Sequence, residues 1–581
     1  MIRARGTPPA LRGRAGIAAI VALGLAWGLL MHAMGWGQSS FYAQVRALGH
    51  GQTEIDRWHW ETGDKAWIDR HYYSVKAPGL AAMTLPVYQG LDAVGAKAVA
   101  RDAAANARET DHPRWTFAYG TTPPYDEQGY SRARAERVWD RIEVGAPIVW
   151  ALTLVGATLP AVGLLFGVRW VADRIEPGYG TAAAITLGLG SIVMVFAAEY
   201  FAHVIAAGLG FAAFALLFRE RERGAARLGL VGAAGLAAGL AVSFEYPLGL
   251  VGAILFVYAL GGPGGRLARG ATYLGGAIAG AAPALLYNWW SLGSPLRFAY
   301  SDAVAVPGYT GHDELGLNDD GLFGITLPRP ESAFDLLFAS RGLLALTPVI
   351  AMALVGVYFM HRRGRIAEAR VIAAIAAVYF IYNCGYWIPF GGGTLGPRFF
   401  IPALPFLALG LACAYRRMPA LTVALAIPSV ILMTVGTLTF PLIGEHGVAE
   451  LVDRWRTGAL EHTVLTVLGV SDAWLAVAPV LLLVAAAAAL AVVATPRTRI
   501  GDIRPALKAV LAWIIVATVG PTLTGDPVTP LNGGGQALSL IAFAACLAMA
   551  TLLSMHYWER RREGEPERMP VADEPVGEPI S

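Results

Sequence analysis

Residues 77–96, APGLAAMTLPVYQGLDAVGA, decide how this chain is threaded, because they are apolar but short and contain two prolines and three glycines. Other apolar runs approach the roughly 20 residues that a helix needs to cross a bilayer. The chain has 581 residues, is 55% hydrophobic and has a mean hydropathy of +0.50. These values predict an all-α polytopic membrane protein. Fourteen spans are predicted, at approximately 16–36, 145–168, 180–198, 201–218, 226–244, 246–262, 268–289, 342–360, 370–388, 399–415, 419–442, 474–495, 507–524 and 537–556.

Basic residues indicate whether 77–96 also crosses. Short cytoplasmic loops carry an excess of Lys and Arg. If the basic N-terminus is inside and 77–96 does not cross, every later basic cluster between the spans falls on the inner side. If 77–96 crossed, all of those clusters would face outward. We therefore predict a juxtamembrane helix on the outer surface, a plasma (inner) membrane location and two cytoplasmic termini.

The predicted organisation follows from this threading. It comprises a cytoplasmic N-terminus (1–15), a first transmembrane helix (16–36), an extracytoplasmic loop with juxtamembrane helices (37–144), a transmembrane core (145–442) with an outer loop (290–341), C-terminal transmembrane helices and outer loops (443–558) and a disordered cytoplasmic tail (559–581). The net charge of +3 is small and the basic residues cluster between spans, which argues against a nucleic-acid partner. The three cysteines lack the spacing of a metal or disulfide framework.

The outer segment 51–79, GQTEIDRWHWETGDKAWIDRHYYSVKAPG, is where we expect chemistry. It carries five carboxylates and two histidines beside a membrane span. A carboxylate held partly out of water can act as a general base for an acceptor hydroxyl, and a nearby Lys or Arg can hold a phosphate. The candidate bases are Glu54, Asp56 and Asp64. The alternative is that these charges belong to a solvated loop.

Cationic and aromatic residues of the outer face are the other candidates. Lys76 and Arg398 are predicted to bind a phosphate group, and His71 is a further candidate. Lys76 could instead be a snorkelling anchor, and Arg398 could pair with an outer-loop carboxylate. Substrate contacts are expected from Tyr73, Glu199 and His203, although a histidine at a span end can be merely interfacial.

Four elements resemble a known superfamily. YYSVKAPG (72–79), NWWSLGSP (288–295), SRGLLALTP (340–348) and GGGTLGPRFFIPALPF (391–406) resemble the GT-C integral-membrane glycosyltransferases that use polyprenyl-phosphate sugars, including protein mannosyltransferase-like and aminoarabinose transferase-like enzymes. The resemblance covers roughly residues 15–415. It implies a GT-C-like bundle, a lipid-linked donor gripped by Lys76 and Arg398, and an outer-loop acid as base.

Two positions depart from the family pattern. The acid that usually follows the first span would fall near Gln38, which cannot act as a base, and the position before the lysine, often acidic, is Val75. Base function is therefore expected at Asp56 or Asp64. A second possibility is that the chain is an inactive member of the family.

The function predicted is glycosyl transfer, of a hexose or pentose, from a polyprenyl-phosphate sugar to an envelope glycan, lipid or protein. The alternatives are a transporter or flippase of lipid-linked saccharides and a non-catalytic scaffold of envelope assembly. A divalent cation, Mg²⁺ or Mn²⁺, between the acids and the donor phosphate is possible. Span interiors nearly free of charge favour the enzyme over the transporter.

Overall fold

The structure is a computed structural model that describes residues 9–109, 132–303, 321, 324–439, 441–442, 447–525, 529–531 and 535–563. It is 75% helical. Residues 304–320 and 322–323 of the predicted outer loop 290–341, including the acidic run 312–320, lie outside the described residues, as does the predicted disordered tail from residue 564 onward.

The predicted spans correspond to helices. Within the described residues, nine helices are long and apolar enough to cross a membrane, or ten if the bent pair Pro330–Leu346 and Val349–Arg362 is one span. Three shorter apolar helices, Gly180–Leu189, Leu228–Phe244 and Tyr246–Leu260, lie where the sequence predicts the spans 180–198, 226–244 and 246–262. The protein is therefore a multi-span helical protein, while the count of fourteen stays a prediction.

The helices have the following bounds, in chain order: α1 (Pro9–Leu29), α2 (Trp36–Gly49), α3 (Gly79–Ala93), α4 (Ala96–Arg108), α5 (Arg132–Thr153), α6 (Leu159–Ile175), α7 (Gly180–Leu189), α8 (Val193–Phe196), α9 (His203–Glu222), α10 (Leu228–Phe244), α11 (Gly249–Leu260), α12 (Arg266–Leu292), α14 (Pro330–Phe338), α15 (Leu343–Leu346), α16 (Val349–Arg362), α17 (Ile366–Gly385), α18 (Leu404–Arg417), α19 (Pro419–Thr439), α20 (Gly447–Thr457), α21 (Val464–Val467), α22 (Ala473–Ala494), α23 (Ile503–Leu523) and α24 (Gly535–Glu563). Shorter turns are η1 (His59–Glu61), η4 (Leu154–Thr158), η5 (Tyr246–Leu248), η6 (Ala299–Asp302) and η7 (Arg398–Ala403).

Small residues bring α10 and α12 into backbone contact. A Cβ at Gly239 would collide with the carbonyl oxygen of Ala277, and one at Gly280 would collide with that of Leu236. Small residues permit such close approach in membrane helix pairs, where no hydrophobic effect drives association. The glycine-rich character of these two helices is thus explained by their contact.

A buried ion pair joins α9 to α12. Glu220 and Arg269 are 0% and 1% exposed, and Arg269 Nη2 donates to Glu220 Oε2 at 2.7 Å. Arg269 Nε donates to the carbonyl oxygen of Ala259 at 2.6 Å, and Nη1 donates to that of Pro263 at 2.7 Å. The guanidinium is thereby satisfied on all three nitrogens, as burial of a charge requires.

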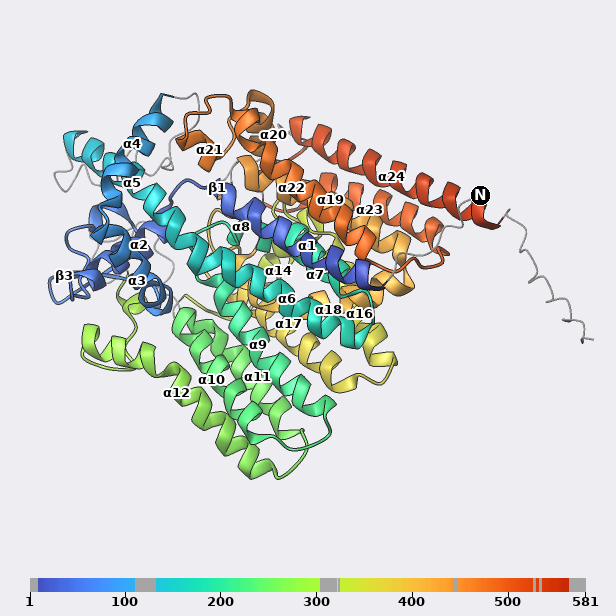
Figure 1. Cartoon of the computed structure of the whole chain (residues 1–581), viewed down its shortest axis with the longest axis horizontal. Helices are drawn as coiled ribbons and strands as arrows, with labels where there is room; N and C mark the ends of the chain where they lie inside the picture. The colour runs from blue at the N-terminus through green and yellow to red at the C-terminus, as the bar shows by residue number, and fades with distance from the viewer. Residues whose placement is uncertain are drawn as a thin grey trace, which may run out of the picture.

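The elements after the first span gather at one end of the helix bundle (Figure 1). Here α2, α3 and α4 pack with η1 and an antiparallel hairpin of β2 (Lys65–Ile68) and β3 (His71–Ser74). Helix α3 occupies most of the 77–96 stretch and has 15 residues, fewer than the roughly 20 needed to span. Its outer-surface location stays a prediction, as do the predicted domain boundaries.

Two short ribbons modify the all-α expectation. Among the described residues these are the β2–β3 hairpin and the pairing of β1 (Leu30–Met31) with β4 (His462–Thr463). The hairpin turn places Asp69 and Arg70 at φ of 51° and 69°. Such turns usually carry Asn or Gly at these positions, so the sequence lacks the common hairpin signal. The β1–β4 pair ties the end of the first span to the C-terminal third of the chain.

Candidate functional site

One face of α2 holds the β2–β3 hairpin in place. Trp36, Ser40 and Gln44 are four residues apart and so lie on the same side of the helix. The carbonyl oxygen of Trp36 accepts a bond from Thr62 Oγ1 at 2.7 Å, and Ser40 Oγ donates to the carbonyl oxygen of Asp64 at 2.6 Å. Gln44 Nε2 donates to the carbonyl oxygen of Lys76 at 3.3 Å. These bonds position the backbone on which the candidate acid and lysine lie.

Asp64 and Lys76 meet across the open end of the hairpin. Lys65 pairs with Ser74 in the register of the two strands, so Asp64 just before β2 lies near the residues just after β3. Lys76 Nζ is 2.6 Å from Asp64 Oδ2, and the side chains are 16% and 12% exposed. The pair is thus largely removed from bulk water while still reachable, which suits a group that exchanges a proton with a substrate.

Arg398 lies between two aromatic rings at the start of η7. Its guanidinium carbon is 5.6 Å from the ring centre of Phe201 and 5.2 Å from that of Phe399. Its Nε is buried and has no hydrogen-bond partner among the described residues. Gly391 has a φ of +79°, and a Cβ at this position would lie 2.8 Å from Arg398 Cγ. The absence of a side chain at Gly391 therefore makes space for Arg398. Arg398 therefore has a buried donor available for an anion.

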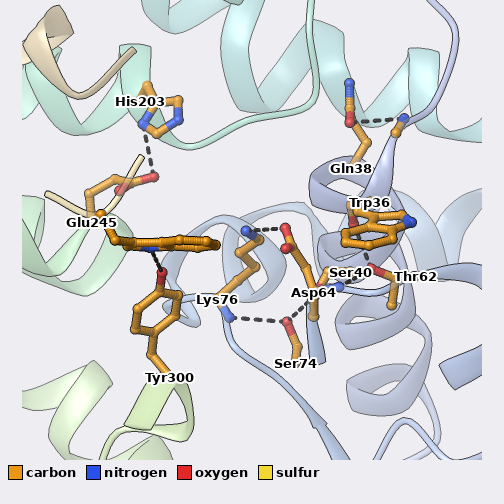
Figure 2. A network of polar contacts seen from close by, with 12 residues as sticks. Trp36, Gln38, Ser40, Thr62, Asp64, Ser74, Lys76, His203, Glu245 and Tyr300 are labelled. Atoms are coloured by element: carbon orange, nitrogen blue, oxygen red, sulfur yellow. Dashed lines mark hydrogen bonds and ion pairs between the residues drawn. The ribbon is translucent and has the colours of Figure 1, made fainter. Parts of the chain in front are cut away.

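Electrostatic interactions connect Arg398 to the Asp64–Lys76 pair. The charges of Lys76 and Arg398 both act on Glu245, whose Oε1 is 3.1 Å from His203 Nδ1. Figure 2 shows Lys76, Asp64, His203 and Glu245 in one network of polar side chains. Residues from the segment after the first span, from α9 and from the α10–η5 connection thus share one region.

Tyr300 borders the same region. Its hydroxyl accepts a hydrogen bond from Trp387 Nε1 at 3.3 Å and makes a short contact with the Tyr386 hydroxyl. Burial raises the pKa of Tyr300, and the negative charge of Asp64 adds to this rise, whereas nearby Arg398 opposes it. The phenol is therefore neutral at physiological pH and could serve as a hydrogen-bonding group rather than as a base.

The remaining first-loop candidates lie at the far edge of the hairpin. Asp56 Oδ2 is 2.7 Å from His71 Nδ1, and its Oδ1 accepts a bond from the Tyr72 amide at 2.7 Å. Both side chains of this pair are exposed, at 41% for Asp56 and 51% for His71. Glu54 forms an isolated β-bridge with Tyr73. Because successive strand residues point to opposite faces, His71 and Tyr73 share one face and Tyr72 and Ser74 the other. Of the two candidate bases, Asp56 therefore lies with His71 at the exposed edge, and only Asp64 meets Lys76.

A second polar network, which the sequence did not predict, lies under α2. Gln38 Nε2 makes a short hydrogen bond to Glu199 Oε2, and His32 Nδ1 is 3.4 Å from Glu461 Oε2. Glu199 and Glu461 are only 1% and 2% exposed. His32 Nε2 and Glu199 Oε1 have no hydrogen-bond partner among the described residues, and both residues line one small cavity. Glu199 thus places a buried carboxylate beside Gln38.

The connection between α8 and α9 gives Glu199 an unusual titration. Burial raises the pKa of Glu199 to about 7 from its ordinary 4.5, and the nearby charge of His32 opposes this only in part. A carboxyl near pH 7 is common at functional sites. No sequence signal marks this property, because it depends on burial by distant segments.

We predict that folding stability falls as the pH rises from about 4.5 to 7, because the unfolded chain releases the Glu199 proton in this range while the folded protein retains it. At about 1.4 kcal/mol per pKa unit, the loss is roughly 3 kcal/mol. Replacing Glu199 by Gln should remove this part of the pH dependence while keeping a partner for Gln38. Thermal unfolding in detergent at pH 5 and pH 8 measures it; equal slopes in the two proteins would contradict the assignment.

Metal ligands are not clustered in the described part of the chain. No group of three or more His, Cys, Asp and Glu side chains is placed there to hold a metal ion. The predicted divalent cation therefore stays a prediction.

Comparison with known proteins finds likeness to solved structures, two of which are described here. No protein-family model matches the chain, and no curated protein sequence matches it. Over 92% of this chain and 88% of the other, it is similar to ArnT from Cupriavidus metallidurans bound to undecaprenyl phosphate, with 15% identity and a TM-score of 0.42. Over 89% of this chain and 60% of the other, it is similar to the apo Archaeoglobus fulgidus oligosaccharyltransferase, with 11% identity and a TM-score of 0.37.

Both of these proteins are glycosyltransferases of the GT-C type, the superfamily that the sequence resembles.

Proposed function

We propose that this chain is a membrane glycosyltransferase that moves a sugar from a polyprenyl-phosphate donor to a cell-envelope acceptor on the outer face. The observation that supports it most is the Asp64–Lys76 pair, at 2.6 Å, in one polar region with Arg398. This arrangement combines a carboxylate that can accept a proton with two cations that can hold a phosphate.

In the proposed reaction, the acceptor hydroxyl gives its proton to Asp64 as its oxygen attacks the anomeric carbon. The bond between that carbon and the phosphate oxygen breaks, and the new glycosidic bond forms. The negative charge that develops on the leaving polyprenyl phosphate is stabilised by Lys76 and Arg398. One base and one stabilised leaving group suffice for a single displacement.

Lys76 has a double role in this scheme. In the absence of donor its ammonium is paired with Asp64. The phosphodiester of the donor carries one negative charge and gains a second as its bond to the sugar breaks, and this added charge would draw the ammonium toward the phosphate. Asp64 is then released to accept the acceptor proton as the leaving group departs.

Aromatic groups around the cations suit a sugar that lies against the phosphate. Tyr386 stacks on Tyr382 with ring centres 5.8 Å apart, and Phe399 meets the Tyr386 ring edge-on at 5.0 Å. Aromatic faces with hydroxyls at their rim offer both apolar contact and hydrogen bonds. Tyr300 and Trp387 extend this wall next to Asp64.

The test is reconstitution of the purified protein in liposomes with a radiolabelled polyprenyl-phosphate sugar and an envelope extract. Transfer of label to the extract supports the transferase. Movement of the donor across the bilayer without transfer would support the flippase instead, for which the buried charged network at His32, Glu199 and Glu461 is the favourable observation. If the protein neither transfers the sugar nor moves the donor, the result would favour the scaffold.

Replacement of Lys76 by Gln is expected to weaken binding of polyprenyl phosphate by about 10- to 100-fold, because a charge-assisted hydrogen bond contributes roughly 1.5–3 kcal/mol. Binding of the sugar-free lipid phosphate, measured by displacement of a fluorescent analogue, separates this effect from chemistry. The matched control is Lys97→Gln, since Lys97 also pairs with an aspartate at 2.6 Å but is 49% exposed. Equal affinities of the two variants would exclude Lys76 from the phosphate site.

A further inference from the structure

A second pocket, which is basic, lies at the C-terminal ends of α6 and α9. It has a volume of about 310 Å³ and is lined by Trp170, Arg174, Arg219, Glu222 and Arg223. Helices α6 and α9 pack against each other along the apolar spans Glu136–Ile175 and His203–Glu222. Because the pocket is at the terminal residues of both spans, it lies where they leave the membrane. The positive-inside pattern places that end on the cytoplasmic side.

The charge in and around this pocket is unbalanced. Glu222 Oε2 is 3.5 Å from Arg174 Nε, and its Oε1 is 3.4 Å from Arg365 Nη2 at the start of α17. One carboxylate thus faces two guanidinium groups before Arg219 and Arg223 are counted. Four arginines and one glutamate give a net charge of +3. Neither Arg219 nor Arg223 forms an ion pair within the part of the chain that the structure describes.

Mutual repulsion among these cations is evident at Arg223. The positive charges of Arg219 and Arg227 lower the pKa of Arg223, although its side chain is exposed to solvent. Like charges held together without counter-ions destabilise each other, and a bound anion relieves that repulsion. The arrangement therefore favours an anion more strongly than isolated surface arginines do.

Trp170 gives the pocket one rigid wall. The guanidinium carbon of Arg174 lies 3.7 Å from the centre of the Trp170 ring, and the ring meets Phe218 edge-on with centres 6.5 Å apart. Arg174 Nη1 also donates to the carbonyl oxygen of Trp170 at 3.0 Å, so stacking and this bond together fix the guanidinium against the indole. Tryptophan is also typical of the headgroup level of a bilayer, which agrees with the position of the pocket at the span ends.

We propose that this pocket binds a phosphate group, supplied by the headgroup of an anionic phospholipid of the inner leaflet. Arginine donors arranged in a planar fork match phosphate oxygens two at a time. A lipid phosphate at the membrane surface stands at the level of Arg174, Arg219 and Arg223, and its chains can lie along the adjoining spans. The site is separate from the proposed transferase site and does not depend on that activity.

The experiment uses full-length protein in neutral phosphatidylcholine nanodiscs, with phosphatidylglycerol added in steps. The wild type should retain bound phosphatidylglycerol in native mass spectrometry and unfold at a higher temperature as its fraction rises. The double variant Arg219→Gln/Arg223→Gln should bind it roughly 30-fold more weakly, from about 1 kcal/mol per basic residue near the membrane. The matched control is Arg362→Gln/Arg370→Gln, which removes the same charge. Arg362 ends α16 and Arg370 lies in the first turns of α17; both are exposed and neither lines the pocket.

Inorganic phosphate, added to protein in neutral nanodiscs, distinguishes the two sources of the group. Stabilisation by phosphatidylglycerol alone assigns the site to lipid, and stabilisation by millimolar phosphate that the pocket variant abolishes assigns it to a soluble phosphate. Equal lipid retention by the pocket and control variants would overturn the proposal. If the Gln variant unfolds in neutral nanodiscs, Arg219→Lys/Arg223→Lys is used instead, because it keeps the charge but loses the planar fork of guanidinium donors. An unchanged affinity of this Lys variant for phosphatidylglycerol would overturn recognition by paired guanidinium donors.

Discussion

Asp64→Asn is expected to lower the rate of sugar transfer by about 10²- to 10⁴-fold, the usual contribution of a positioned general base. Asparagine has nearly the same shape, and its carbonyl oxygen can still accept a hydrogen bond from Lys76, but it cannot take up a proton. The loss should therefore appear in kcat, with donor affinity changed only a few-fold. Single-turnover transfer from a radiolabelled donor, together with binding of polyprenyl phosphate, measures the two quantities separately.

Two matched variants define the result. Asp92→Asn removes a carboxylate that also pairs with a lysine at 2.6 Å, but on an exposed part of α3, and should leave the rate unchanged. Asp56→Asn tests the other base expected from the sequence; its pairing with His71 at the exposed edge of the hairpin predicts a rate near that of the wild type. A large loss with Asp56→Asn and none with Asp64→Asn would transfer the role of base to Asp56.

Glu220→Gln is expected to lower the free energy of unfolding by about 3–5 kcal/mol, because it leaves the buried guanidinium of Arg269 without its counter-charge. Arg269 is 1% exposed, so its guanidinium is removed from water in the folded protein. Denaturant-induced unfolding in mixed micelles, followed by circular dichroism, provides the measurement. The same variant should keep its donor affinity per folded molecule, since Glu220 is not part of the proposed site.

An exposed ion pair provides the control for this prediction. Asp140 lies 2.8 Å from Arg108, with side chains 62% and 42% exposed. Asp140→Asn should cost less than about 1 kcal/mol, as exposed pairs usually do. Similar losses for Glu220→Gln and Asp140→Asn would mean that water reaches Arg269 in the folded protein.

The sequence predicts the candidate residues of the site, but it does not predict which of them meet in the folded protein. The sequence identified Asp64, Lys76 and Arg398 by charge and by their positions beside predicted spans. It could not separate Asp64 from Asp56, because both are acids of one loop. The choice depends on the register of the β2–β3 hairpin, whose Asp69–Arg70 turn has no common hairpin signature.

The second network shows the same limit more strongly. Gln38 and Glu199 are 161 residues apart, and His32 and Glu461 are 429 residues apart. Taken singly, His32 and Glu461 have no distinguishing neighbours in the sequence. They become notable only because folding buries them together, and burial is what raises the pKa of Glu199.

Hydrophobicity, which acts locally along the chain, was enough to predict a multi-span helical protein. The threading implied by the basic clusters and the loop in which we expect chemistry stay predictions. Which acid meets the lysine, which arginine has a free buried donor and which carboxyl titrates near neutrality were decided only by the tertiary structure. The physical reason is that these properties depend on distances and on exclusion of water, and both are set by segments that are far apart in sequence.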